Sequence, residues 1–189
     1  QIVASNTPAL AALITAAGGE PIDLGIVRDN DAATVAALAD GRDRGVDILV
    51  TLGGASVGDH DLVRKAFADV GMELGFWRIA MRPGKPLIFG HLGGIRVLGL
   101  PGNPVSSLVC AMLFLIPLVR ALQGDAAPGP AYAAARLTHR MPANDGREDY
   151  VRARLTERDD GLPEADPFSL QDSSMLSTLA ASGALIVRP

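Results

Sequence analysis

Residues 47–71, DILVTLGGASVGDHDLVRKAFADVG, carry the pattern that decides the fold: a short apolar stretch, a glycine-rich loop and an amphipathic helix. DILVTL at 47–52 is typical of a buried strand, because it is a brief apolar run that ends at glycine. HDLVRKAFADV at 60–70 places its apolar residues on one helical stripe, and Gly71 ends the helix. A strand that leads through a glycine loop into a helix is typical of α/β proteins.

The same alternation continues on both sides of this unit. Helices are predicted at 7–17 and 31–45, and a long apolar helix is predicted to begin after Asn103, which caps it. The predicted strands are 21–27, 74–81, 86–90 and 95–100. Residues 1–125 are therefore expected to form an α/β domain with a doubly wound, mainly parallel sheet. In such a sheet a ligand binds beyond the carboxyl ends of the strands.

The last third of the chain has a different pattern. GDAAPGP has the composition of a linker, which we place at 126–131. Residues 132–189 are expected to form a small β domain. Its predicted elements are strands at 131–141, 148–158 and 184–189 and a short helix at 175–181. The arginines that alternate along its second strand are expected on a solvated face; they are Arg147, Arg152 and Arg154.

Composition and charge exclude several classes of function. The 189 residues are 48% hydrophobic and 20% charged, which is the balance of a globular protein. Because 17 basic and 21 acidic residues give a net charge of −4, no general attraction to nucleic acid or to an anionic membrane is expected. The apolar window 108–122, interrupted by Pro117 and Arg120, is about 15 residues long and is expected to be too short for a membrane span. The single cysteine, Cys110, excludes an intramolecular disulfide and favours a cytoplasmic location.

Three glycine-rich loops follow predicted strands. The small residues of the first, which permit close approach of backbone N–H groups to an oxyanion, are Gly53, Gly54, Ser56 and Gly58. Asp59 and His60 stand where a nucleotide-binding P-loop has Lys and Ser/Thr, so a nucleoside triphosphatase is disfavoured. The carboxylates of Asp59 and Asp61 either serve chemistry, as a Mg²⁺ ligand, a general base or a pterin-like donor group, or one of them caps the following helix.

The second and third loops are candidates for anion binding. Arg82-Pro83-Gly84-Lys85-Pro86 is either an anion clamp, with Arg82 as a planar fork and Lys85 as a point charge, or a turn whose charges face solvent. The third loop begins the long helix, whose dipole favours an anion there, although alone it is equally a well-capped helix start. Its candidate ligands are Pro101, Gly102, Asn103, Pro104 and Ser106.

The segments GGASVGDHD, RPGKP and GLPGNPVSS, in this order and at these separations, closely resemble the molybdopterin molybdenumtransferase family, which includes bacterial MoeA and the E domain of gephyrin. QIVASN and LGIVRDN extend the resemblance over nearly the whole chain. The resemblance implies a molybdopterin-binding α/β module followed by a small β domain that stops before its usual last strands. It also implies that the chain, which begins at Gln1, is cut from a longer enzyme.

The resemblance further implies a reaction and its ligands. The family hydrolyses adenylylated molybdopterin, inserts molybdenum from molybdate into the dithiolene, and releases AMP. Asp61 would be the catalytic carboxylate and would bind Mg²⁺, and the glycine-rich loops would hold the phosphates. The residues that would hold molybdate are Arg82, Lys85, Arg152 and Ser173.

Departures from the family pattern keep alternatives open. Ala4 stands where the family has an acidic residue, and Arg82 replaces the first lysine of its loop. Because further domains and a partner subunit complete the family's site, the chain is expected to bind ligands with little turnover. The full-length protein is expected to be a homodimer that receives substrate from the molybdopterin adenylyltransferase. The alternatives are that adenylyltransferase itself, which GGAS and the second domain disfavour, and a non-catalytic molybdopterin-binding or scaffold module.

Overall fold

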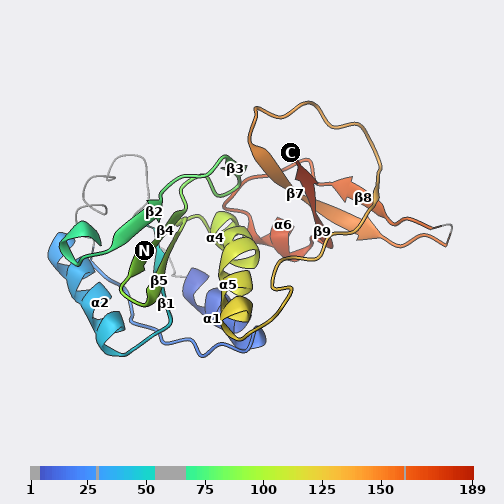
Figure 1. Cartoon of the computed structure of the whole chain (residues 1–189). Coiled ribbons are helices and arrows are strands. Elements are labelled where there is room, and N and C mark those ends of the chain that lie inside the picture. The colour runs from blue at the N-terminus through green and yellow to red at the C-terminus, as the bar shows by residue number, and fades with distance from the viewer. Residues whose placement is uncertain (1–4, 29, 54–66, 160) are drawn as a thin grey trace.

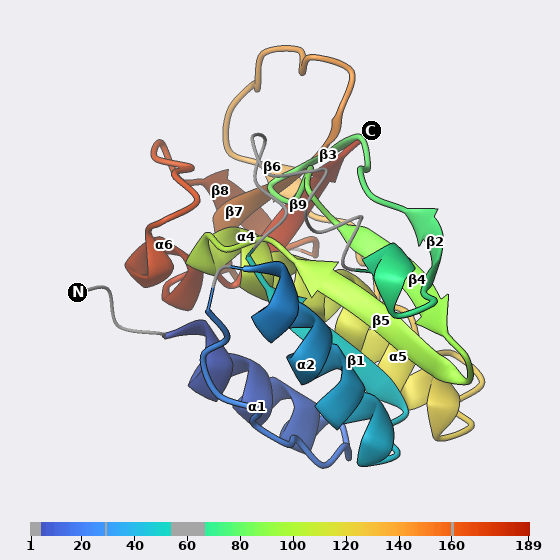
Figure 2. The ribbon, with the colours of Figure 1, turned by 90° about the vertical axis from the view of Figure 1, so that its left-hand side faces the viewer.

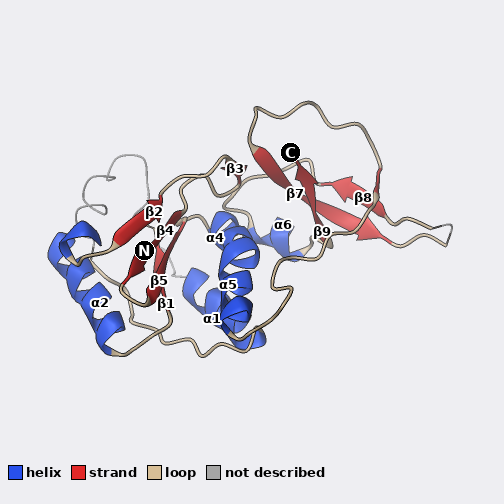
Figure 3. Ribbon diagram, in the orientation of Figure 1, coloured by secondary structure: helices blue, strands red, loops and turns tan. Residues whose placement is uncertain are grey.

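The computed structural model of the protein describes residues 5–28, 30–53, 67–159 and 161–189 and shows an α/β part followed by a β part (Figures 1 and 3). The α/β part contains α1 (Asn6–Ala16), α2 (Asp31–Asp43), β1 (Ile48–Leu52), β2 (Glu73–Phe76), β4 (Ile88–Leu92), β5 (Ile95–Leu100) and one long helix made of α4 (Pro104–Cys110), η1 (Ala111–Leu115) and α5 (Ile116–Leu122). The β part contains β6 (Arg136–Leu137), β7 (Glu148–Thr156), β8 (Glu164–Pro167), α6 (Leu176–Ala180) and β9 (Ala184–Arg188), and it is joined by β3 (Met81–Arg82).

The predicted α/β fold with a small β domain is confirmed, but the described sheet is mixed rather than mainly parallel. Its strand order is β1-β5-β4-β2, in which β1 and β5 are parallel and β4 is antiparallel to both of its neighbours. The reason is the turn at Gly93-Gly94, which joins β4 directly to β5 as a hairpin. A connection this short cannot cross over the sheet, so the two strands must be antiparallel.

Helices cover both faces of this sheet: Figure 1 shows α2 on one side and α1 with the long helix on the other, and Figure 2 shows α2 in front of the sheet and α5 behind it. On one face, α1 and the long helix pack against alternate residues of β1 and β5, such as Val50 and Leu98. On the other face, Leu38 of α2 packs against Leu49 and Val97. Successive residues of a strand point to opposite faces, so one apolar strand supplies both cores.

The prediction of a strand at 21–27 is wrong. This segment forms no strand, and its Ile22 and Ile26 side chains are 48% and 88% exposed. An apolar alternating pattern becomes a strand only where a neighbouring strand can pair with it. Among the described strands, β1 at this side of the sheet pairs only with β5.

Two other strand predictions are corrected in extent. The expected strand 74–81 divides, because its last residue joins the β part as β3 while β2 stays in the α/β sheet. Of the expected strand 131–141, only Arg136–Leu137 pairs, and β8 is an additional strand. Of the helix expected at 60–70, the described residues 67–69 are helical.

The long helix contains one π-helical turn, Ala111–Leu115, just before Pro117. Proline lacks an N–H and its ring crowds the carbonyl four residues earlier, so a wider turn relieves the conflict. The helix Pro104–Leu122 has 19 residues and is long and apolar enough to cross a membrane, so the expectation from length is wrong. Half of this stretch is buried in the fold, where it packs against α1 and the sheet.

Strand β7 is the centre of the β part. It pairs with β8 and β9 in antiparallel fashion and with β3 in parallel fashion. In the chain, β3 lies between β2 and β4, which both belong to the α/β sheet, but β3 itself pairs with β7. The segment around Arg82 therefore connects the two parts of the molecule.

Candidate functional site

The described portions of the three glycine-rich loops meet at one edge of the α/β sheet. Parallel strands β1 and β5 both end there, with Leu52 opposite Leu100. Antiparallel β4 begins there, with Ile88 opposite Gly99, so the RPGKP loop that precedes it lies at the same edge. We call the region formed by Gly53, residues 82–86 and residues 101–104 the loop edge.

Gly53 and Gly102 bring the first and third loops into contact. Gly53 has a φ of 79°, and a Cβ added to Gly102 would lie 3.5 Å from the Gly53 Cα. The Gly53 N–H donates to the Leu100 carbonyl at 3.0 Å. Gly53 therefore serves the loop geometry, and its N–H is not free for an oxyanion. The remaining predicted ligands of the first loop lie outside the described residues; they are Gly54, Ser56, Gly58 and Asp61.

Ser173 of the β part accepts two hydrogen bonds that hold the third loop and the start of α4. Asn103 precedes α4, but its side chain does not cap the helix as expected, because Nδ2 donates to Ser173 Oγ at 2.8 Å. The Val105 N–H, which such a cap would satisfy, donates to the Ser173 carbonyl at 3.0 Å. Backbone N–H groups of Gly102 and Asn103 donate to no described residue, and they are therefore the donors open to an anion at this helix start.

Polar atoms beside the start of α4 are incompletely satisfied. Asn6 Nδ2 donates to the Gly102 carbonyl at 2.9 Å, whereas Asn6 Oδ1 is buried and has no partner among the described residues. The hydroxyl of Ser107 is also buried without a described partner. Ser106, a predicted ligand, is only 6% exposed, so the more accessible candidates at this loop are Gly102 and Asn103.

Arg152 is buried, and the expectation that it lies on a solvated face is wrong. It is 2% exposed, and its Nε donates to Gln171 Oε1 at 3.2 Å while Nη1 donates to the Asp172 carbonyl at 3.0 Å. It forms no ion pair with any described residue, and desolvation lowers its pKa, with partial opposition from the Asp172 charge. The positive charge of Arg152 thus lies beside the loop that contains Ser173, because its guanidinium donates to the preceding residue, Asp172.

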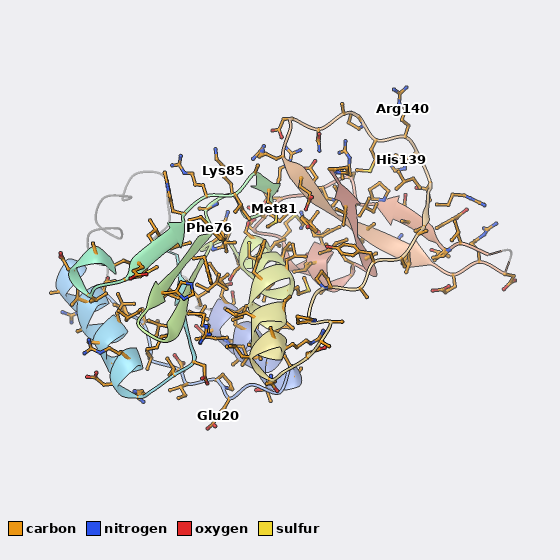
Figure 4. All side chains as sticks on the ribbon, in the orientation of Figure 1. Glu20, Phe76, Met81, Lys85, His139 and Arg140 are labelled. Atoms are coloured by element: carbon orange, nitrogen blue, oxygen red, sulfur yellow. The ribbon has the colours of Figure 1, made fainter. Side chains whose placement is uncertain are left out.

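Arg82 and Lys85 of the RPGKP loop have different surroundings. Arg82 donates from Nε to Asp149 Oδ1 at 2.9 Å and from Nη2 to Oδ2 at 2.8 Å, and this pair raises the pKa of Arg82. Arg188 contacts the same carboxylate, with 3.4 Å between its Nη1 and Asp149 Oδ2. Lys85 is exposed, forms no ion pair within the described residues, and extends outward in Figure 4.

Some of these contributors were not predictable as site residues. Asp149 gave no signal of a buried carboxylate, because it follows Glu148 in a strand that also carries arginines, and Gln171 gave none either; Asn6 lies within QIVASN, which carried the resemblance but no assigned role. No group of three or more His, Cys, Asp or Glu side chains gathers among the described residues. The predicted magnesium ligand, Asp61, is outside that set, so the magnesium site stays a prediction.

Comparison with known proteins gives consistent matches along the chain. Residues 1–121 match the family described as "Probable molybdopterin binding domain", and residues 134–189 match "MoeA C-terminal region (domain IV)". The molybdopterin molybdenumtransferase of Haemophilus influenzae is 34% identical over 99% of this chain and 46% of its own length. That of Nostoc sp. is 38% identical over 100% of this chain and 44% of its own length.

A solved structure shows the same arrangement. The molybdopterin biosynthesis MoeA protein of Pyrococcus horikoshii superposes with a TM-score of 0.80 at 30% identity, covering 100% of this chain and 44% of that protein. The present chain therefore spans less than half the length of these relatives. Since the first family match covers well over half of the chain and the second follows it in order, the chain belongs to the molybdopterin-binding family of molybdenum cofactor biosynthesis, with a MoeA-type C-terminal domain.

Proposed function

We propose that this chain binds adenylylated molybdopterin and molybdate at the loop edge, as part of the reaction that inserts molybdenum into molybdopterin and releases AMP. The observation that carries the proposal is the gathering of anion-binding groups from both parts of the chain. Lys85 offers a cation without an ion-pair partner in the described structure, and Gly102 and Asn103 offer backbone donors. Both chemistries suit phosphate and oxometalate groups.

The β part contributes to the same ligand through Ser173 and Arg152. Because Ser173 Oγ accepts a hydrogen bond from Asn103, its own hydroxyl proton is available for an oxygen of molybdate. Arg152 is held by neutral oxygens of Gln171 and Asp172, so its positive charge is not cancelled by an ion pair within the described residues. A buried charge of this kind acts strongly on a nearby anion, because little water screens it.

Calorimetric titration of the protein with molybdate tests the proposal. Lys85→Ala is expected to weaken binding at least about tenfold, the loss of one charge-assisted contact. The matched control is Arg96→Ala, which removes a cation from the opposite end of β5, and binding there should change less than about twofold. Equal affinities for Lys85→Ala and Arg96→Ala would remove the molybdate assignment.

A second experiment separates this function from its enzymatic rival. We expect adenylylated molybdopterin to bind, and AMP to be the only nucleotide product formed from it. ATP-dependent adenylylation of molybdopterin by the wild-type chain would instead identify an adenylyltransferase. The match of residues 134–189 to the MoeA C-terminal region favours the molybdenum-inserting reaction.

A further inference from the structure

The guanidinium of Arg82 is committed to a buried carboxylate. Its Nε and Nη2 make two parallel hydrogen bonds to Asp149, whose side chain is 3% exposed although that of Arg82 is 48% exposed. Such a fork fixes both the distance and the plane of the two groups. Two of its three nitrogens are therefore in use, and the third, Nη1, lies 3.6 Å from Asp145 Oδ2.

The rest of the RPGKP loop is held at several further points. The backbone of β3 pairs with β7, placing Arg82 beside Asp149, and the Glu148 N–H donates to the Ala80 carbonyl at 2.9 Å. The Ile79 N–H closes the loop by donating to the Lys85 carbonyl at 3.1 Å. Between these contacts Gly84, with a φ of 117°, lies so close to α4 that a Cβ would be 2.5 Å from Cys110 Sγ.

Among the described residues, Lys85 is thus the cation of this anchored loop that has no ion-pair partner. Its backbone carbonyl accepts hydrogen bonds from both Ile79 and Leu87, while its side chain is exposed and has no ion-pair partner in the described part of the chain. A long flexible side chain is an accurate ligand only when its backbone is fixed. Arg82 lies three residues before Lys85, at the point where the loop meets β7.

We propose that Asp149 is a positioning residue and that Arg82 connects the RPGKP loop to it instead of binding molybdate. Together they hold Lys85 in place as the molybdate ligand of this loop. The inference rests on the proposed function and changes the role that the family resemblance implies for Arg82. It also makes the β part a requirement for the anion site of the α/β part.

Electrostatics alone predicts the opposite response to mutation at Asp149. If Arg82 were a direct ligand, removing the Asp149 charge would free the guanidinium and leave the site more positive, so molybdate would bind as well or better. If Asp149 positions the loop, removing its charge releases Arg82 and the loop that carries Lys85, and molybdate binds less well. The sign of the change therefore distinguishes the two roles.

Molybdate titration of four variants tests the proposal. Asp149→Asn and Arg82→Gln are each expected to weaken molybdate binding about fivefold to tenfold. The double variant is expected to bind molybdate no more weakly than whichever single variant binds it more weakly. Arg82→Lys should resemble Arg82→Gln, because an ammonium keeps the charge but cannot make the two-bonded fork. Asp145→Asn is the matched control, since it removes an exposed carboxylate of the same network, and binding should change less than about twofold.

The outcomes separate cleanly. Unchanged or tighter binding by Asp149→Asn, or near wild-type binding by Arg82→Lys, would overturn the positioning role. Circular dichroism establishes that each variant is folded at the assay temperature, and if Asp149→Asn does not fold, the comparison of Arg82→Lys with Arg82→Gln decides. If wild-type protein fails to bind molybdate, or Lys85→Ala binds it normally, the proposed function fails instead.

Discussion

Two arginine sites on β7 differ in the partner of the guanidinium: the Arg82–Asp149 pair at the start of the strand, which we call the Asp149 end, and Arg152 at its middle, which we call the Arg152 end. At the start of the strand, half-exposed Arg82 meets the buried carboxylate of Asp149. Three residues further on, Arg152 is itself buried, and its guanidinium donates to neutral oxygens of Gln171, Asp172 and Met175. The exposure of an arginine therefore does not tell whether its charge is available to a ligand. The partner of the guanidinium tells that.

The physical consequence is a division of labour. An ion pair with one buried partner stabilises a fixed geometry, and breaking it leaves an uncompensated charge. An arginine held by neutral acceptors keeps its electrostatic field, but burial makes its charged form less favourable. This desolvation is what lowers the pKa of Arg152. The Asp149 end is suited to holding the RPGKP loop, and the Arg152 end is suited to attracting an anion.

The largest expected effect comes from Gly84, which lies in the RPGKP loop that Arg82 connects to Asp149. Gly84→Ala puts a side chain at a φ of 117° and within 2.5 Å of Cys110 Sγ. Backbone strain and overpacking together are expected to lower the free energy of unfolding by about 3 kcal/mol. Urea denaturation measures this loss. The control is Gly93→Ala, which has a φ of 59° and no atom within 4 Å of the new Cβ, and should cost about 1 kcal/mol. Equal losses would show that the loop is not tightly packed.

Replacing Arg152 removes the buried charge of the Arg152 end. Arg152→Met is expected to lower the free energy of unfolding by about 2 kcal/mol, because the Asp172 carbonyl loses its charged donor. Saturating molybdate should raise the midpoint of thermal unfolding of the wild type but not of this variant. Arg154→Met, at an exposed position two residues on, should keep the shift. Loss of the shift in both variants would mean that general positive charge, and not Arg152, attracts the anion.

The sequence predicts those parts of this arrangement that depend on neighbouring residues. The strands 95–100 and 148–158 are recognisable because their apolar patterns are local, and β5 and β7 confirm them. The glycine loops are recognisable for the same reason, and the described portions of them do meet at one edge. The segment 21–27 shows the limit, since its pattern is that of a strand but no described partner pairs with it.

The site depends more on residues that are distant in the chain. Arg82 and Asp149 are 67 positions apart, and Arg152 and Gln171 are 19 apart. No spacing rule joins such residues, and the family resemblance implies the same molybdate-binding role for Arg82 and Arg152. Only the fold shows that one faces a carboxylate and the other faces an amide and a carbonyl.

A third prediction probes the packing beneath the RPGKP loop through Cys110. Burial raises the pKa of this thiol from 9.0 to about 12, so the folded state favours the neutral form. Its contribution to stability is full below pH 9 and is lost as the pH rises to about 12. At pH 10 the wild type should have lost about 1.4 kcal/mol relative to Cys110→Ala, compared with their difference at pH 8. Urea denaturation of both proteins at the two pH values measures this, and a difference independent of pH would show that the thiol ionises freely in the fold.

The smallest expected effect comes from Asp145, the exposed carboxylate of the same network as buried Asp149. The hydrogen bonds of Arg147, aided by the charge of Arg82, lower the pKa of Asp145 from 3.8 to about 2. Its stabilising contribution is therefore present above pH 4 and is lost as the pH falls to about 2. Because the Asp145 side chain is 51% exposed, water and salt screen the pair, and Asp145→Asn should lower the midpoint of thermal unfolding at pH 7 by only about 1 °C. Unfolding scans between pH 7 and pH 2, repeated in 1 M NaCl, measure the difference, which should shrink with acid and with salt. A loss of more than about 5 °C that persists in 1 M NaCl would contradict the distinction between buried and exposed carboxylates, because an exposed pair would then stabilise the fold as strongly as a buried one.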